Sequence, residues 1–231
     1  MNGFLFDLRG NWAHYRKPET NNNPLTHDFI TKTAVLGLIG AVLGVERREM
    51  ARLFPQLSED LLYGVCVKNE VRKESWAFTL RYVTDFFQKA PKQMEFLKNP
   101  ENRIALALRG ERSGDIFAAF QAAVKEREAR FTPVLGLHNC PAELSFVSAG
   151  EFTAETGEFE TQAFVTGRHE IVQRGTESFR LGVERLPTFQ NDDFWNLPER
   201  YVRVIYPSEG GLLKARGEHF QYSDQSRWAL I

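Results

Sequence analysis

The sequence lacks most of the features that mark metal and redox proteins. Its two cysteines, Cys66 and Cys140, match no metal-binding or redox spacing. The five histidines form no His-x-x-x-His pair, and no P-loop, Rossmann glycine fingerprint or Gly-x-Ser-x-Gly sequence is present. We therefore expect a protein with no metal and no cofactor, whose two thiols stay reduced.

Long apolar segments are also absent. The longest apolar run, residues 34–45, has 12 residues, whereas a helix needs about 20 to cross a bilayer. The N-terminus has no basic segment followed by an apolar stretch and a cleavage site. These absences predict a cytoplasmic protein with no membrane partner.

An excess of positive charge is missing as well. The chain has 29 lysines and arginines against 30 acidic residues, a formal net charge of −1. Proteins that bind nucleic acid alone through charge are usually basic. A nucleic-acid role would therefore need a local basic patch, or partners that share the phosphate load. The 19 phenylalanines can supply a large core and also cover a protein–protein contact.

Residues 31–44 predict an apolar helix that ends at Gly44 and contains two interior glycines, Gly37 and Gly40. Each interior glycine costs a helix about 1 kcal/mol relative to alanine. That cost favours glycines that allow close approach to another surface. A buried helix packed tightly on a sheet would meet this expectation without any binding role.

The start of the same helix is a candidate phosphate site. Thr31 suits the N-cap position, and Lys32 and Thr33 fall in the first turn. Free backbone N–H groups, hydroxyls and a lysine at a helix N-terminus favour an anion. The sequence therefore offers two interpretations of this segment, a phosphate site and a structural helix.

The first 150 residues predict the order strand, helix, strand, strand, helix, strand, which is typical of a ferredoxin-like fold. The expected strands are residues 3–9, 61–68, 76–83, 104–108 and 144–146, and the expected helices are residues 31–44, 46–54 ending at Pro55, and 113–130 capped by Ser113. The open face of such a sheet is a common RNA-binding surface. The apolar residues of 84–102 follow neither the helical nor the strand period, and we interpret this segment as an inserted, projecting arm.

The pattern changes after Gly150. Short alternating stretches at 162–166, 170–174, 179–185 and 200–206 lie between turn residues, without a long helix. We therefore predict an α+β protein with a first domain at 1–150 and a smaller β-rich region at 151–231 that packs on it.

A polar loop between the first strand and the first helix contains a further candidate site. Residues 12–17, Trp-Ala-His-Tyr-Arg-Lys, combine aromatic rings with cations, which can stack on bases and neutralise phosphates. An ordinary solvated loop has the same composition. His14, Tyr15 and Lys32 could alternatively perform metal-free RNA cleavage by acid–base chemistry.

A second connector, residues 130–141, follows the later helix. Pro133 prevents the helix from continuing, and Gly136 permits an unusual backbone turn. His138 could contact a phosphate, although a lone histidine is more often a packing residue. Locally, this segment indicates a structural connector.

Taken together, these motifs resemble one protein family. The segments that carry the resemblance are residues 12–18, 24–26, 31–33, 37–44, 130–136 and 140–141. In this order and spacing the chain resembles the Cas-five family of CRISPR-associated proteins, within the RAMP superfamily. The N-terminal motifs are most similar to the type I-B branch.

The resemblance implies a ferredoxin-like (RRM-like) RAMP domain with a thumb-like insertion and a smaller β-rich part. It implies a non-catalytic structural subunit of the Cascade ribonucleoprotein in antiviral defence. Such a subunit holds the five-prime handle of the CRISPR RNA and caps the backbone filament. Its partners would be a backbone subunit of the Cas-seven family, a large subunit of the Cas-eight family and, through the assembled complex, target DNA. The type I-C branch offers the alternative of a metal-independent endoribonuclease that processes precursor CRISPR RNA.

The resemblance also gives candidate RNA-binding residues. They are Arg9, Trp12, His14, Tyr15, Arg16, Thr31, Lys32, Thr33, Gly37, Arg81 and His138. For the nuclease alternative, the catalytic candidates are His14, Tyr15 and Lys32. Neither interpretation requires a metal or a cofactor.

Overall fold

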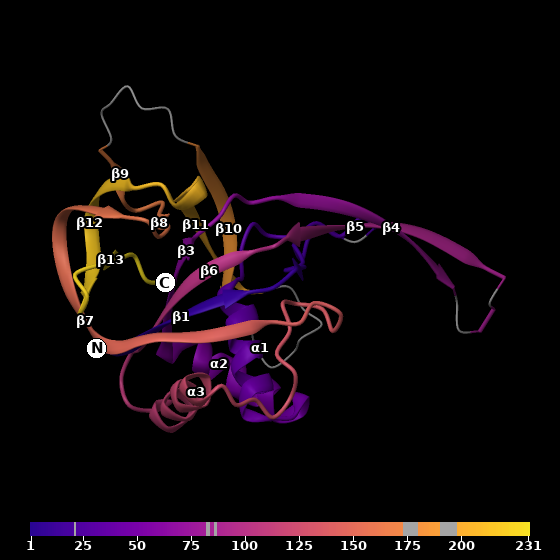
Figure 1. The fold of residues 1–231 in the computed structure, drawn as a ribbon, viewed down its shortest axis with the longest axis horizontal. Helices are drawn as coiled ribbons and strands as arrows, with labels where there is room; N and C mark the ends of the chain where they lie inside the picture. Colours follow the sequence, from indigo (N-terminus) through magenta and orange to yellow (C-terminus); the bar gives the residue numbers. More distant parts are fainter. Residues whose placement is uncertain (21, 82–83, 86, 173–179, 190–197) are drawn as a thin grey trace.

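A seven-stranded antiparallel sheet forms the centre of the computed structural model, which describes all residues except 21, 82–83, 86, 173–179 and 190–197 (Figure 1). Its strand order is β13-β12-β7-β1-β6-β3, with β9 paired to β12. The strands are β1 (Asn2–Arg9), β3 (Leu61–Val67), β6 (Glu101–Leu108), β7 (Glu143–Thr161), β9 (Glu170–Ile171), β12 (Leu213–Tyr222) and β13 (Arg227–Trp228). The first, second and fourth strands of the expected order are therefore present as β1, β3 and β7.

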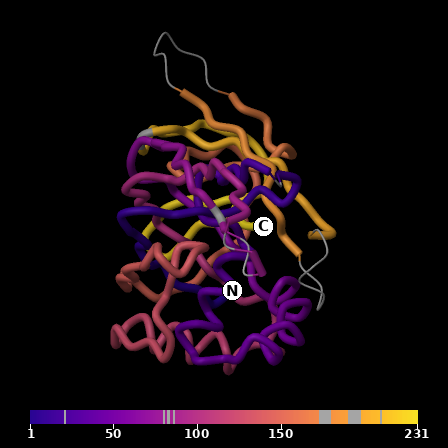
Figure 2. The backbone as a smooth tube through the Cα atoms, turned by 90° about the vertical axis from the view of Figure 1, so that its right-hand side faces the viewer, coloured from indigo at the N-terminus to yellow at the C-terminus, as the bar shows by residue number. Residues whose placement is uncertain are grey.

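The strands after residue 161 lie in the upper part of the view, with β9, β12 and β13 among them as part of this same sheet, and the helices gather below (Figures 1 and 2). The helices are α1 (Lys32–Leu43), α2 (Arg47–Asp60) and α3 (Gly114–Glu126). Because side chains alternate along a strand, Phe4, Phe6 and Leu8 of β1 join the same large core as α1, α2 and α3. Leu5 instead belongs to a second cluster beneath the C-terminal strands. No helix among the described residues is long and apolar enough to cross a membrane.

Helix α1 follows the prediction at both ends. The Thr31 hydroxyl accepts a hydrogen bond from the Ala34 N–H at 3.2 Å, and Gly44 ends the helix in the left-handed conformation at φ 74°. A Cβ at Gly40 would lie 2.8 Å from the Met50 sulfur, so this glycine does permit close packing on α2. Gly37 is exposed and a Cβ there would meet nothing within 4 Å. The packing explanation is therefore wrong for Gly37.

The expected end of the next helix at Pro55 is also wrong, because α2 continues through the proline to Asp60. A proline inside a helix costs about 3 kcal/mol or more. Met50, Phe54 and Leu57 are nevertheless buried at helical spacing, and this packing offsets the local penalty.

Helix α3 is shorter than predicted. It ends at Glu126, and Arg127 adopts the left-handed conformation at φ 59°. Ser113 does stand at its N-cap position, but the Ser113 hydroxyl donates to the Asp60 carboxylate instead of capping the helix. Only the backbone position of the predicted cap is therefore confirmed.

The projecting arm is a β-hairpin, with different boundaries from those predicted. Strands β4 (Lys73–Arg81) and β5 (Lys89–Lys98) pair with each other, and β2 (Trp12–Ala13) pairs with the base of β5. The hairpin extends far from the body of the molecule (Figure 1). Strand 76–83 therefore belongs to the arm, with 82–83 outside the described residues, and β6 takes its place in the large sheet. Alternation identified the strand but could not identify its partner.

The C-terminal part is rich in strands, as predicted. A second sheet has the order β10-β11-β8, formed by β10 (Leu181–Phe189), β11 (Arg200–Pro207) and β8 (Val165–Thr166), and a short 3₁₀ helix, η1, covers Ser208–Gly210. Parts of the predicted stretches, at 173–174 and 179, lie outside the described residues. Strand β7 runs through Gly150, pairing first with β1 and then with β12. The division of the chain at residue 150 stays a prediction.

Candidate nucleic-acid interface

The first turn of α1 holds a buried lysine without a partner. Lys32 is only 4% exposed, although its position in the first turn predicted an accessible side chain. Within the described part of the chain, its ammonium forms no ion pair and no hydrogen bond. The Thr31 and Thr33 hydroxyls lie beside each other at 3.0 Å, and Thr31 caps the helix. Three polar side chains therefore gather where backbone N–H groups are free.

The electrostatics of this position are strongly positive. Burial, together with the nearby charges of Arg109 and Arg200, lowers the pKa of Lys32 from 10.5 to about 8. The N-terminal end of the α1 dipole adds partial positive charge. Among the described residues no carboxylate forms an ion pair with this ammonium, so an anion would stabilise it. Arg200 itself pairs with Glu59 at 3.6 Å. Arg109 follows β6 and Arg200 begins β11, and sequence reasoning identified neither residue.

Gly37 belongs to the exposed flank of the same helix. It lies one turn beyond Thr33, which is partly exposed, and the space above it is open. A glycine there leaves backbone atoms accessible without a side chain. This arrangement suits the close approach of a ligand to α1, which is the role that the resemblance implied for Gly37.

The 12–17 loop is more buried than its composition predicted. His14 is 3% exposed, its Nδ1 lies 2.7 Å from the Glu95 carbonyl oxygen, and burial lowers its pKa. Tyr15 is also buried, which raises its pKa far above the ordinary value. Both side chains are therefore buried in the isolated chain, as Lys32 is. The structure thus contradicts an exposed role for both residues.

Two members of this loop do remain accessible. Trp12 is partly exposed, packs edge-on against Trp76 at 4.5 Å between ring centroids, and has the Lys98 ammonium 5.8 Å from its ring. Arg16 is exposed and donates to the Thr20 carbonyl. Trp12 therefore lies at the base of the arm, where an aromatic ring and a cation meet.

The connector at 130–141 explains why the loop is buried. The His14 N–H donates to the Leu135 carbonyl at 3.0 Å. Gly136 has φ 89°, and any Cβ there would overlap the His14 carbonyl. The loop and the connector, far apart in sequence, therefore form one structural unit. His138, within the connector, is exposed.

The other predicted residues lie elsewhere. Arg9 is exposed at the end of β1 and pairs with Glu143 at 2.7 Å. Arg81 is exposed at the last position of β4, on the outer part of the arm. The structure thus gathers Thr31, Lys32 and Thr33, and it does not bring all candidates into one site.

A buried ionic network joins the polar loop to β10. Glu184 is 4% exposed, lies 3.0 Å from both the Lys17 ammonium and His27 Nδ1, and accepts the Asp28 N–H at 3.1 Å. Burial alone would raise the pKa of Glu184, but its bonds with His27 and Lys17 lower it to about 2. The network therefore fixes the loop that precedes α1.

The network continues to the base of the arm. Lys73 of β4 lies 2.7 Å from the Asp28 carboxylate and 3.3 Å from that of Glu95 in β5. Tyr206 of β11 donates a short hydrogen bond to the other Asp28 oxygen. Polar residues of the loop thus anchor both the arm and the second sheet.

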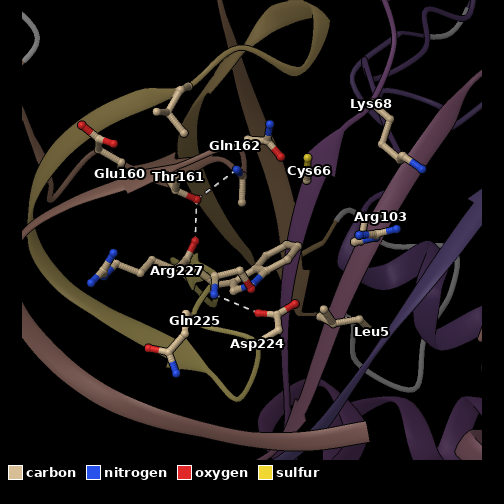
Figure 3. Close-up of a pocket in the computed structure, with 14 residues that line it drawn as sticks. Leu5, Cys66, Lys68, Arg103, Glu160, Thr161, Gln162, Asp224, Gln225 and Arg227 are labelled. Carbon is tan, nitrogen blue, oxygen red and sulfur yellow. Dashed lines mark hydrogen bonds between the residues drawn. The ribbon is translucent and has the colours of Figure 1, made fainter. Parts of the chain in front are cut away.

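A cavity of about 260 Å³ lies on the sheet face away from the helices (Figure 3). Leu5, Cys66 and Trp228 line it, together with Lys68 and Arg103. Both cations pair with Asp7, and burial raises the pKa of the Cys66 thiol to about 11. Lys68 also pairs with Glu101 at 3.0 Å, so two carboxylates balance the two cations. Because the thiol is protonated as well, the cavity is a weaker anion site than the start of α1. The described residues contain no group of three potential metal-ligating side chains.

Comparisons with known proteins point to one family. A family model described as CRISPR-associated protein (Cas_Cas5) matches residues 3–203. The crystal structure of a CRISPR protein from Archaeoglobus fulgidus aligns with 99% of this chain and 98% of its own, at a TM-score of 0.57 and 14% identity. A chain of a CRISPR RNA-guided surveillance complex aligns with 89% of this chain and 90% of its own, at a TM-score of 0.54 and 13% identity. No curated protein sequence matches significantly.

Proposed function

Because the chain belongs to the Cas5 family of CRISPR-associated proteins, we propose that it is a non-catalytic RNA-binding subunit of a type I Cascade complex, most similar to type I-B. In this role it holds the five-prime handle of the CRISPR RNA and caps the backbone filament. The observation that carries the proposal is Lys32, a buried ammonium at the start of a helix, with no carboxylate partner within the part of the chain that the structure describes. An RNA phosphate supplies the charge that this site lacks.

The topology supports a ferredoxin-like core for this subunit. The four strands β7-β1-β6-β3 are adjacent and antiparallel, and they alternate with helices that pack in one shared core. A similar fold occurs in a chain of a CRISPR RNA-guided surveillance complex. Shared use of the RNA by several subunits is consistent with the net charge of −1.

The arm supplies the contact with the neighbouring backbone subunit in this proposal. Its outer part combines exposed cations, Arg81 and Lys89, with Phe87, which is 94% exposed. A projecting hairpin cannot bury these groups against its own body along its whole length. A protein surface next to bound RNA would contact both kinds of side chain.

Trimming the arm should separate assembly from folding. Phe78 faces Lys92 across the hairpin, so an Asn-Gly turn can replace residues 79–91 and preserve the register. The trimmed chain should keep its thermal stability but fail to co-elute with the other Cascade subunits in size-exclusion chromatography. Normal co-elution would rule out the contact role.

A longer replacement provides the matched control. Exchanging residues 85–100 would remove Phe96 and Leu97, which are each 1% exposed in the core. That variant should unfold or precipitate, because losing buried side chains of this size costs about 2–5 kcal/mol each. Equal behaviour of the two variants would mean that the arm boundaries are wrong.

The non-catalytic role can be tested directly. The purified chain is incubated in EDTA with labelled RNA that carries the repeat of the neighbouring CRISPR array. We expect the RNA to be bound and to keep its length. Site-specific shortening of the RNA would instead establish the endoribonuclease alternative, for which His14, Tyr15 and Lys32 are the candidate catalytic residues.

A further inference from the structure

A row of arginines crosses the second sheet. Arg185 of β10 lies directly opposite Arg203 of β11, and both side chains are exposed. The turn after β8 continues the row, because the Gly167 N–H donates to the Arg203 carbonyl at 3.0 Å and Arg168 is the next residue. We call Arg168, Arg185 and Arg203 the arginine row.

The row is electrostatically unfavourable in the isolated chain. Like charges directly opposite each other on neighbouring strands destabilise a sheet. Among the described residues, no carboxylate forms an ion pair with any of the three arginines. Glu184 shares β10 with Arg185, but it is buried on the opposite side of the strand. A sequence with a net charge of −1 therefore concentrates positive charge here.

An aromatic ring lies within the row. The Arg185 guanidinium is 4.5 Å from the centroid of the Tyr201 ring, which is partly exposed. The charge of Glu19 also acts on Tyr201 and raises its pKa. The surface thus offers fixed guanidinium groups and a ring that can stack on a base.

We propose that the arginine row binds the phosphodiester backbone of a nucleic acid, as a second contact beyond the start of α1. The proposal rests on the proposed function and extends it. Guanidinium groups bind phosphate oxygens in a bidentate manner, and such contacts carry no sequence information. A bound phosphate removes the repulsion between Arg185 and Arg203.

The row lies close enough to the first site for one strand to reach both. Arg200, whose charge acts on Lys32, belongs to the same strand as Arg203. Three residues of a β-strand span about 10 Å. Because Arg200 and Arg203 are an odd number of residues apart, their side chains face opposite sides of β11. A nucleic acid that leaves the start of α1 would therefore pass around the end of the second sheet, where Arg200 begins β11, to reach the arginine row.

The test compares two charge-matched double variants of the full chain. Arg185→Gln/Arg203→Gln removes two charges from the row, and Arg48→Gln/Lys125→Gln removes two exposed charges from α2 and α3. Fluorescence anisotropy measures binding to a labelled single-stranded RNA and to a labelled DNA duplex over a range of salt concentrations. The two probes show whether the row takes RNA or DNA.

We expect the row variant to bind at least one probe about tenfold more weakly, with a salt slope lower by about 1 to 2. Its melting temperature should equal or exceed that of the wild type, because a like-charge pair is lost. Binding by the row variant equal to that of the control variant, with both probes, would overturn the inference. The inference would also be overturned if the wild-type row bound a labelled acidic peptide but neither the RNA nor the DNA probe.

A third variant separates this outcome from a failure of the proposed function. If Lys32→Met weakens RNA binding and the row variant does not, the proposed function stands and the arginine row is not a binding site. If only the row variant weakens binding, the row is confirmed and the start of α1 is not the phosphate site. A wild-type chain that binds neither probe contradicts both.

Discussion

The Lys32→Met variant should be more stable than the wild type and yet bind RNA at least tenfold more weakly. Methionine has a similar length without the charge, so it fills the same space and removes the desolvated ammonium. The fall in the pKa of Lys32 from 10.5 to about 8 corresponds to a cost on the order of 3 kcal/mol for the charged form. Loss of a charged hydrogen bond to phosphate costs about 1.5–3 kcal/mol of binding.

The same lysine predicts the pH dependence. Its pKa is lower in the folded chain than in the unfolded chain, so the unfolded chain binds more protons between pH 8 and 10.5. The unfolding free energy of the wild type should therefore rise with pH in this window. RNA affinity should fall as Lys32 loses its proton. Both trends should be absent in Lys32→Met.

Urea unfolding and RNA anisotropy at pH 7 and at higher pH measure the two effects. Lys125→Met, at an exposed position of α3, is the matched control and should leave both nearly unchanged. A Lys32→Met protein that is less stable than the wild type and binds RNA equally well would disprove the phosphate site.

The Glu184→Gln variant should lose roughly 3–5 kcal/mol of stability at neutral pH. Glutamine keeps the shape and can still accept the Asp28 N–H. It leaves the Lys17 ammonium and His27 without the buried carboxylate that lies 3.0 Å from each. The loop before α1 should loosen, and RNA binding should weaken with it.

The dependence of the unfolding free energy on pH below neutrality shows whether the Glu184 carboxylate causes this loss of stability. The pKa of Glu184 is lowered from 4.5 to about 2, so its contribution is present above pH 4.5 and is lost as the pH falls towards 2. This part of the acid destabilisation should be missing in Glu184→Gln. Glu128→Gln, an exposed change after α3, serves as the control. Identical acid limbs for wild type and Glu184→Gln would show that the network contributes little.

Local sequence patterns predicted the helices and strands well, but they did not predict which strands and helices pack together. The alternation of Phe4, Phe6 and Leu8 identified β1 and its buried face, and Thr31 with Gly44 gave both ends of α1. The same alternation identified β4, but the choice between the large sheet and the arm depends on a partner strand that no local pattern encodes. The extension of α2 through Pro55 likewise depends on packing against α1.

The candidate site shows the same limit of prediction from local sequence. Lys32 was identified from its place in a first turn, but its burial and the nearby charges of Arg109 and Arg200 arise from segments far away in sequence. The burial of His14 depends on Gly136, more than a hundred residues later. Sequence could therefore name individual residues, while their exposure and charge environment needed the fold.

The hairpin arm also acts as a lever. From Lys73↔Leu97 to Arg81↔Lys89 its paired length is about 26 Å at the usual rise of a strand. A rotation of about 10° at its base would thus move the far end by roughly 5 Å. Lys73, Asp28 and Glu95 clamp that pivot, next to the loop that leads into α1. If the arm contacts a neighbouring subunit as proposed, a displacement of its far end would load this ion-pair cluster and, through Asp28, the loop that leads to Lys32.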